Sequence, residues 1–141
     1  MGYIHCISFI EAPIEGIIMM KLSFVFLLNT IAAIVYAIGF LIVPDTVMGL
    51  HGLPAGATQA LMARYFGTAL LGMGLITWFV REVAHPPLKE GITLSLFLSS
   101  LAGCVLSIQA TLSGQMNALG WLPAGIYLLL TLGFGYFRFF K

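Results

Sequence analysis

The chain has 141 residues, of which 60% are hydrophobic and 8% are charged, and its formal net charge is +1. A water-soluble domain carries about 25% charged residues, so this chain has too few polar groups to cover a surface in water. We therefore exclude a soluble protein and expect an integral membrane protein of one domain. The chain has neither a basic stripe nor an acidic tail, and we expect no nucleic-acid partner.

The first twenty residues, "MGYIHCISFIEAPIEGIIMM", lack the basic start and the small-residue cleavage site of a signal peptide. Two interpretations stay open for this segment. In one, the native protein starts at Met19 or Met20, directly before Lys21. In the other, residues 1–20 belong to the protein and lie in the cytoplasm or at the membrane interface.

Four apolar stretches follow, at about residues 22–43, 60–80, 91–112 and 119–137. As helices, each would rise about 30 Å, which is close to the hydrocarbon thickness of a bilayer. The connections are short, and short connections place consecutive helices antiparallel. Residues 21–141 are therefore predicted to form an all-α integral membrane four-helix bundle with antiparallel up-down topology. The loop between the first two spans has room for one short interfacial helix.

Basic residues predict how this bundle is oriented. If the four helices alternate, five basic residues fall on one side of the membrane, and the opposite loops contain no Lys or Arg. Basic loops stay in the cytoplasm, so both termini are expected there (N-in and C-in). The five residues are Lys21, Arg81, Lys89, Arg138 and Lys141.

Small residues recur on the second and third helices at the spacing of one helical face. Gly67 and Gly74 share a face with Arg64 on the second helix, and a row of small residues recurs at every fourth position on the third. Small faces let helices approach closely in lipid, so these residues are predicted to pack helices together. The row on the third helix is Ser95, Ser99, Gly103 and Ser107.

Arg64 is the one basic residue placed near the outer side of the predicted bundle, about one turn inside its helix. Asp45 is the only acidic residue on that side, and antiparallel packing brings both to the same leaflet. A charge in the membrane needs a partner, so we expect Arg64 to lie on the packed face and to contact Asp45 or the loop between them. Tyr36 and Gln109 are expected to line a small polar pocket beside this ligand or ion-pair site.

No arrangement of residues predicts catalysis. The two cysteines, Cys6 and Cys104, are far apart, and no CxxC motif, Cys/His cluster or histidine pair within the spans occurs. No nucleophile–base pair stands out either. We expect no catalytic residue, no metal site and no cofactor.

The order of features resembles a known group of proteins. The first span ends in "LIVPDTVMGLHG", the second opens with "ARYFGTALLGMGLITWFVR", and "NALGW" precedes the last. Over residues 21–141 this is similar to uncharacterised small bacterial four-helix inner-membrane proteins, and more distantly to DoxX-like proteins. The resemblance implies a four-helix bundle in a bacterial inner membrane, and a redox-accessory role for some relatives. No cofactor residue of such proteins matches a position of this chain.

Two functions remain, and they differ in class. The first is a structural or accessory subunit that packs against a larger membrane complex, or against its own copies, through the small-residue faces. The second is a binding protein or carrier for a small amphiphile, such as a quinone, a lipid or an organic anion, with a pocket around Arg64. We rank the accessory subunit first, because it needs no chemistry and the sequence offers none. Membrane lipids are partners under both hypotheses.

Overall fold

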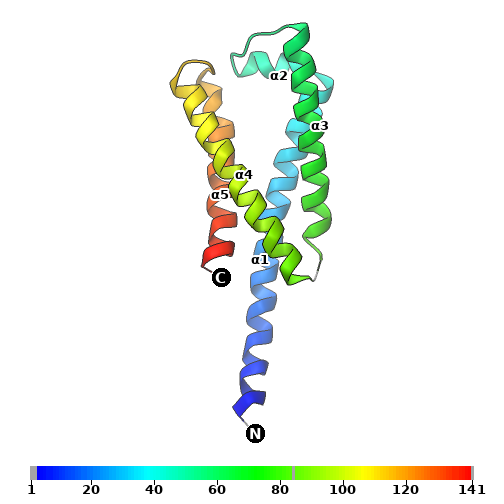
Figure 1. Cartoon of the computed structure of the whole chain (residues 1–141), viewed down its shortest axis with the longest axis vertical. Helices are drawn as coiled ribbons and strands as arrows, with labels where there is room; N and C mark the ends of the chain where they lie inside the picture. Colours follow the sequence, from blue (N-terminus) through cyan, green and yellow to red (C-terminus); the bar gives the residue numbers. More distant parts are fainter. Residues whose placement is uncertain (1–2, 84, 141) are drawn as a thin grey trace.

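The computed structural model describes the backbone of residues 3–83 and 85–140, and the side chains of these ranges from Lys21 onwards. The described chain is all-α, as predicted (Figure 1). Four of its helices are long and apolar enough to cross a membrane, as expected of a multi-pass membrane protein. In chain order the elements are α1 (Tyr3–Ile42), α2 (Pro44–Leu50), α3 (Ala57–Val80), α4 (Pro86–Leu112), η1 (Ala118–Gly120) and α5 (Trp121–Phe139).

The N-terminal segment continues the first helix and is not an element of its own. Helix α1 runs without a break from Tyr3 to Ile42, and only its part from Lys21 to Ile42 is a candidate membrane span. Figure 1 shows the N-terminal part of α1 projecting beyond the ends of the other helices. The backbone of the segment at residues 1–20, for which the sequence leaves two interpretations open, is helical from Tyr3 onwards, and residues 1–2 lie outside the described part of the chain.

Proline and glycine explain where several helices begin and end. Pro44 opens α2 and Pro86 opens α4, at positions where the missing backbone N–H costs no helical hydrogen bond. The His85 side chain caps α4 by accepting a hydrogen bond from the Leu88 backbone N–H (3.3 Å). After α2, Gly52 adopts a φ of +75°, a left-handed conformation that glycine adopts without strain.

The four long helices form two closely packed pairs, α1 with α3 and α4 with α5. Glycines make both contacts close. A Cβ atom at Gly67 would lie 3.1 Å from the backbone oxygen of Ala37 on α1, and one at Gly103 would lie 2.8 Å from the Tyr127 ring on α5. Close approach through small residues replaces the hydrophobic driving force that is missing in lipid.

At one end of the molecule the two pairs pack tightly together. Phe26 of α1 and Phe134 of α5 are completely buried, and their ring centroids lie 5.6 Å apart. Val80, Leu96 and Leu130 complete this cluster, so that all four long helices contribute to it. We call it the packed core.

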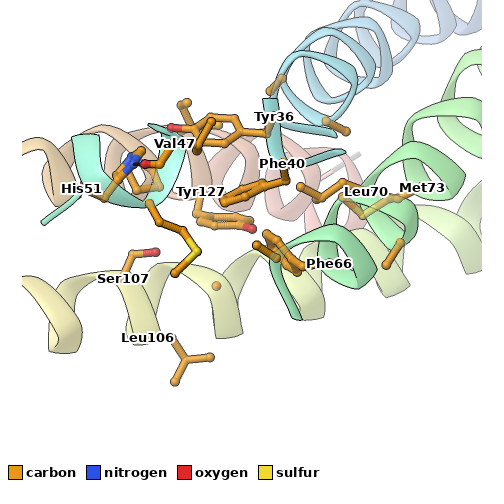
Figure 2. A pocket seen from close by; sticks show the side chains of 18 of the residues that line it. Tyr36, Phe40, Val47, His51, Phe66, Leu70, Met73, Leu106, Ser107 and Tyr127 are labelled. Atoms are coloured by element: carbon orange, nitrogen blue, oxygen red, sulfur yellow. Dashed lines mark hydrogen bonds between the residues drawn. The ribbon is translucent and has the colours of Figure 1, made fainter. Parts of the chain in front are cut away.

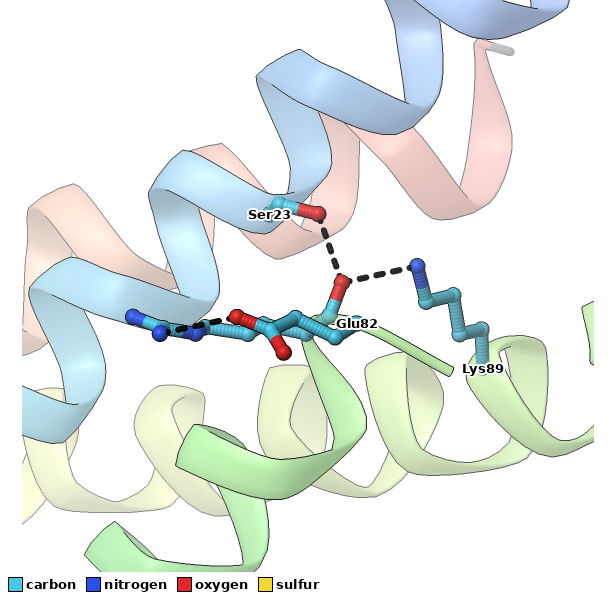
Figure 3. A network of polar contacts seen from close by, with 4 residues as sticks. Ser23, Glu82 and Lys89 are labelled. Carbon is cyan, nitrogen blue, oxygen red and sulfur yellow. Dashed lines mark hydrogen bonds and ion pairs between the residues drawn. The ribbon is translucent and has the colours of Figure 1, made fainter. Parts of the chain in front are cut away.

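A polar contact lies at the same end as the packed core. The backbone oxygen of Arg81, just after α3, accepts hydrogen bonds from Ser23 Oγ of α1 (2.7 Å) and from Lys89 Nζ of α4 (3.0 Å). Figure 3 shows the Ser23 and Lys89 side chains converging on this oxygen. Arg81 itself pairs with Glu82 (2.9 Å) and stacks on the Trp78 ring. Three helices are therefore tied together at this end.

At the opposite end the two pairs diverge, and the short helix α2 connects them (Figure 1). Asn117 lies in the turn between α4 and α5 and donates two hydrogen bonds to backbone oxygens at the end of α2. Its side-chain Nδ2 donates to the Leu50 oxygen (2.8 Å), and its backbone N–H donates to the His51 oxygen (2.9 Å). Gly52 lies against Asn117, at a distance where a Cβ atom would be only 3.1 Å from the Asn117 Cβ. We call these contacts the α2 bridge.

Candidate functional site: a cavity between the helix pairs

A cavity of about 930 Å³ lies between the two helix pairs, bounded by the packed core at one end and the α2 bridge at the other. Ligand pockets in proteins have volumes of about 300–1,000 Å³, so the space is sufficient for a small amphiphile. Its walls are formed by side chains of α1, α2, α3, α4 and α5 and of the loops beside α2. The site therefore depends on the arrangement of the whole molecule and on no local motif.

Aromatic rings form much of the wall near α2. Phe40 contacts Phe66 edge-on (5.4 Å between centroids) and lies 6.1 Å from Tyr36, which in turn lies 6.2 Å from the His51 ring. Figure 2 shows His51 at one end of the cavity and Met73 at the other, with these aromatic rings between them. The aromatic rings thus lie between the His51 side chain at the α2 end and the Met73 side chain towards the packed core.

The cavity opens sideways, between α3 and α4. These two helices contact each other little, although a short loop joins them. Their cavity-lining side chains are also exposed on the outside of the protein: Met62 is 59% exposed, Phe66 47% and Leu106 63%. Since α3 and α4 are candidate membrane spans, this side of the cavity would face lipid chains in a bilayer.

Two side chains that line the cavity carry polar atoms without a hydrogen-bond partner among the described residues. They are the Tyr36 hydroxyl and His51 Nε2, both buried. The other ring nitrogen of His51, Nδ1, lies 2.9 Å from the Val47 carbonyl oxygen. Buried polar atoms usually have partners, so these two atoms are the strongest sign of a ligand in the described structure.

None of the described side chains that line the cavity has the permanent charge of Asp, Glu, Lys or Arg. The deepest polar residue on the wall, Asn29, already donates to the Thr77 hydroxyl (3.4 Å), which lies 2.8 Å from that of Thr30. A charged ligand group would therefore lose its hydration without gaining a counter-ion. The cavity fits an uncharged molecule.

The structure differs from the sequence expectation at Arg64. Its neighbour Ala63 lies on the buried face of α3, but the Arg64 side chain is exposed and does not line the cavity. Asp45 is exposed in the first turn of α2, where the helix dipole favours a carboxylate. Among the described residues the only ion pair within 4 Å is that of Arg81 and Glu82, so the expected contact between Arg64 and Asp45 is not formed as an ion pair.

Of the two residues expected to line the pocket, one lies in the cavity. Tyr36 is part of the wall, whereas Gln109 is exposed and lies outside it. The pocket is also larger and less polar than the small polar pocket expected beside Arg64. Its centre lies between the helix pairs, because α4 and α5 diverge from α1 and α3 at this end.

The small residues of α4 face the cavity more than they face another helix. Ser99, Gly103 and Ser107 line the cavity, and of these Gly103 also lies against Tyr127. Ser95 is exposed, and its hydroxyl bonds to the Gly91 backbone oxygen of its own helix (2.9 Å). The buried face of α4 is the adjacent row of Lys89, Thr93, Leu96, Ser100 and Cys104. On α3, Gly67 and Gly74 do lie against α1.

His51 is the site residue that the sequence interpretation missed. The sequence analysis assigns His51 no role, yet it is 8% exposed and lies on the cavity wall. The signal in the sequence is the spacing of Met48 and His51, which lie three residues apart in and directly after the short helix that follows the first span. Both are buried, as expected for two residues on the inner face of an interfacial helix.

Comparisons of the chain with models of protein families, with curated proteins and with solved structures gave no match.

Proposed function

We propose that this protein binds, and carries or presents, a small uncharged amphiphile in the cavity between its two helix pairs. The observation that carries the proposal is the cavity itself, about 930 Å³ in volume and lined, among the described residues, mainly by apolar and aromatic side chains and by none with a permanent charge. A closely packed bundle gains dispersion energy from filling such a space. The amphiphile would supply those contacts in place of protein side chains.

The lateral opening supports the same proposal. A molecule dissolved in the bilayer would enter between α3 and α4 without crossing water, because the exposed lining side chains of Met62, Phe66 and Leu106 border that gap. The site differs from the pocket around Arg64 that the sequence suggested. Of the ligand classes considered there, an organic anion fits least, since the cavity offers it no positive charge.

We further propose that the four helices cross the membrane in an up-down arrangement with both ends in the cytoplasm. Lys21, Arg81, Lys89 and Arg138 lie near the end that contains the packed core. Basic residues favour the cytoplasmic side, which would place α2 at the outer surface. Lys141 lies outside the described residues. Reporter fusions at the C-terminus should be active only in the cytoplasm, and a C-terminus found outside would contradict this orientation.

The binding proposal is tested by filling the cavity. Ala69 lines the cavity on α3, whereas its exposed neighbour Thr68 does not, so Ala69→Phe and Thr68→Phe form a matched pair. Each protein is purified in a mild detergent, and the small molecules that co-purify are measured by mass spectrometry. The parent and Thr68→Phe should retain one class of amphiphile, and Ala69→Phe should lose it.

Equal retention by both variants would overturn the proposal, and so would a parent protein that carries no small molecule. A protein partner recovered in stoichiometric amount, with the cavity empty, would instead favour the accessory subunit that the sequence ranked first. Because both variants add the same ring to the same helix, a general loss of stability would affect both.

A further inference from the structure

We infer that the amphiphile carries a hydroxyl group, and that this group lies between His51 and Tyr36 at the α2 end of the cavity. The inference rests on the proposed function and adds the chemical class of the ligand and its orientation in the cavity. It starts from the protonation of His51. The Val47 carbonyl oxygen can only accept, so Nδ1, 2.9 Å away, must carry a proton and donate it.

In a neutral His51 the proton on Nδ1 leaves a free lone pair on Nε2. This atom is therefore an acceptor without a donor, and it is buried. The Tyr36 hydroxyl can donate or accept, and it has no partner among the described residues either. The two rings lie 6.2 Å apart, centroid to centroid, so the pair offers one acceptor and one donor at the same end of the cavity.

Of the common uncharged polar groups, an alcohol or phenol hydroxyl matches this pair. Its O–H would donate to His51 Nε2 while its oxygen accepts from the Tyr36 hydroxyl. A ketone, a quinone carbonyl or an ether can only accept, and would leave the Nε2 lone pair buried without a donor. Both protein atoms are covered in the structure, so a small rotation of the two side chains accompanies binding.

The rest of the cavity determines in which direction the apolar tail of the ligand extends from the hydroxyl group. Beyond Tyr36 the wall includes Phe40, Phe66, Leu70 and Met73 on one side and Leu106 on the other (Figure 2), and its deepest polar residue, Asn29, already donates to Thr77. A chain that starts at His51 would pass these side chains and leave between α3 and α4. The ligand class is therefore a neutral lipid-like molecule with a hydroxyl head and one apolar tail in the cavity.

The test uses two photoreactive probes that differ in one hydrogen-bond donor. A hexadecanol analogue with a diazirine in mid-chain and its methyl ether are each added to the full-length protein in phosphatidylcholine nanodiscs. After illumination, the labelled peptides are identified by mass spectrometry. The alcohol should label the peptides that contain Phe66, Leu70 or Leu106, and the ether should label them about tenfold less, as expected for one lost hydrogen bond.

Tyr36→Phe is the variant that separates ligand binding from structure. It removes a hydroxyl that has no partner among the described residues, so melting should be unchanged or improved, while labelling by the alcohol should fall several-fold. Tyr65→Phe, at an exposed position of α3 outside the cavity, is the matched control and should change neither. A Tyr36→Phe protein that melts lower but is labelled as strongly as the parent would mean that Tyr36 serves the fold, and would overturn the inference.

The probes also separate this inference from the proposed function. Equal labelling of the cavity by the alcohol and the ether would overturn the hydroxyl while leaving the amphiphile site intact. Labelling by neither probe in the cavity, with labelling only at lipid-facing positions such as Leu129, which is 72% exposed, would overturn both.

Discussion

The two ends of this molecule are built from the same four apolar helices, yet one end is filled and the other is hollow. At the filled end, Phe26 and Phe134 meet in the centre, and Ser23, Arg81 and Lys89 tie three helices together. At the hollow end the centre is a cavity, and the α2 bridge spans the two helix pairs.

The difference lies in what meets at the centre. Apolar residues from all four long helices converge in the packed core, whereas at the hollow end the helix pairs diverge, and small residues such as Ala69, Ser99 and Ala102 line the cavity together with the aromatic rings. Hydrophobicity does not distinguish the two ends, because lipid solvates apolar side chains as well as a protein core does. Van der Waals packing does distinguish the two ends, so the same kind of substitution should change stability by different amounts at each end.

The largest effect is expected at the packed core. Phe134→Ala should destabilise the protein by roughly 3 kcal/mol, the lower end for Phe→Ala in water-soluble cores, because lipid solvates the ring in the unfolded state. Phe66→Ala, at the hollow end, removes the same ring from a half-exposed position and should cost less than about 1 kcal/mol. Unfolding in mixed micelles, followed by tryptophan fluorescence, measures both, and similar losses would mean that the two ends are equally well packed.

The next effect concerns the contact within one helix pair. Gly67→Leu should cost about 1–3 kcal/mol, because a Cβ at this position lies 3.0 Å from the Phe40 Cβ and 3.1 Å from the Ala37 oxygen. Gly72→Leu is the control on the same helix, where a Cβ has nothing within 4 Å. That variant should be neutral or slightly stabilising, since glycine is a poor helix former. If both variants were equally stable, α1 and α3 would not be in contact at Gly67.

A smaller effect is expected at the α2 bridge. Asn117→Ala removes the hydrogen bond to the Leu50 oxygen and the cap on the Leu119 N–H (2.9 Å), each worth about 1 kcal/mol. Amide hydrogen exchange should become faster in α2 and in the turn before η1, while the packed core keeps its protection. Gln115→Ala in the same exposed turn should leave exchange unchanged. Faster exchange throughout the molecule would contradict a local role.

Much of the fold follows from the sequence, because span length and apolar composition decide where helices form. The α1–α3 contact at Gly67 and Gly74 also agrees with the spacing of small residues. The cavity could not be predicted in this way. It depends on the divergence of two helix pairs, which is set by side-chain volumes across four helices and by the contact of Asn117 with α2.

Arg64 shows why a rare charge misled the prediction of the site. Its position next to the buried Ala63 placed it close to the packed face of α3, but a rotation of 100° per residue carries it out to the exposed side. A long side chain near a helix end reaches the headgroups without a partner. His51, by contrast, carries no permanent charge and lies outside the spans, so neither its charge nor its depth in the membrane marks it, and its spacing from Met48 is the one signal in the sequence.

The most direct test of the hollow end compares two leucines of equal burial. Leu70 is 8% exposed and faces the cavity, whereas Leu96 is 7% exposed and belongs to the packed core. In nanodiscs, with methyl-labelled leucines in a deuterated protein, nuclear Overhauser effects report which methyl groups touch protonated apolar chains. We predict contacts at Leu70 and at the lipid-facing Leu129, and none at Leu96. If such contacts were seen at Leu129 but at neither Leu70 nor Leu96, no apolar chain would occupy the cavity, and the account would be contradicted.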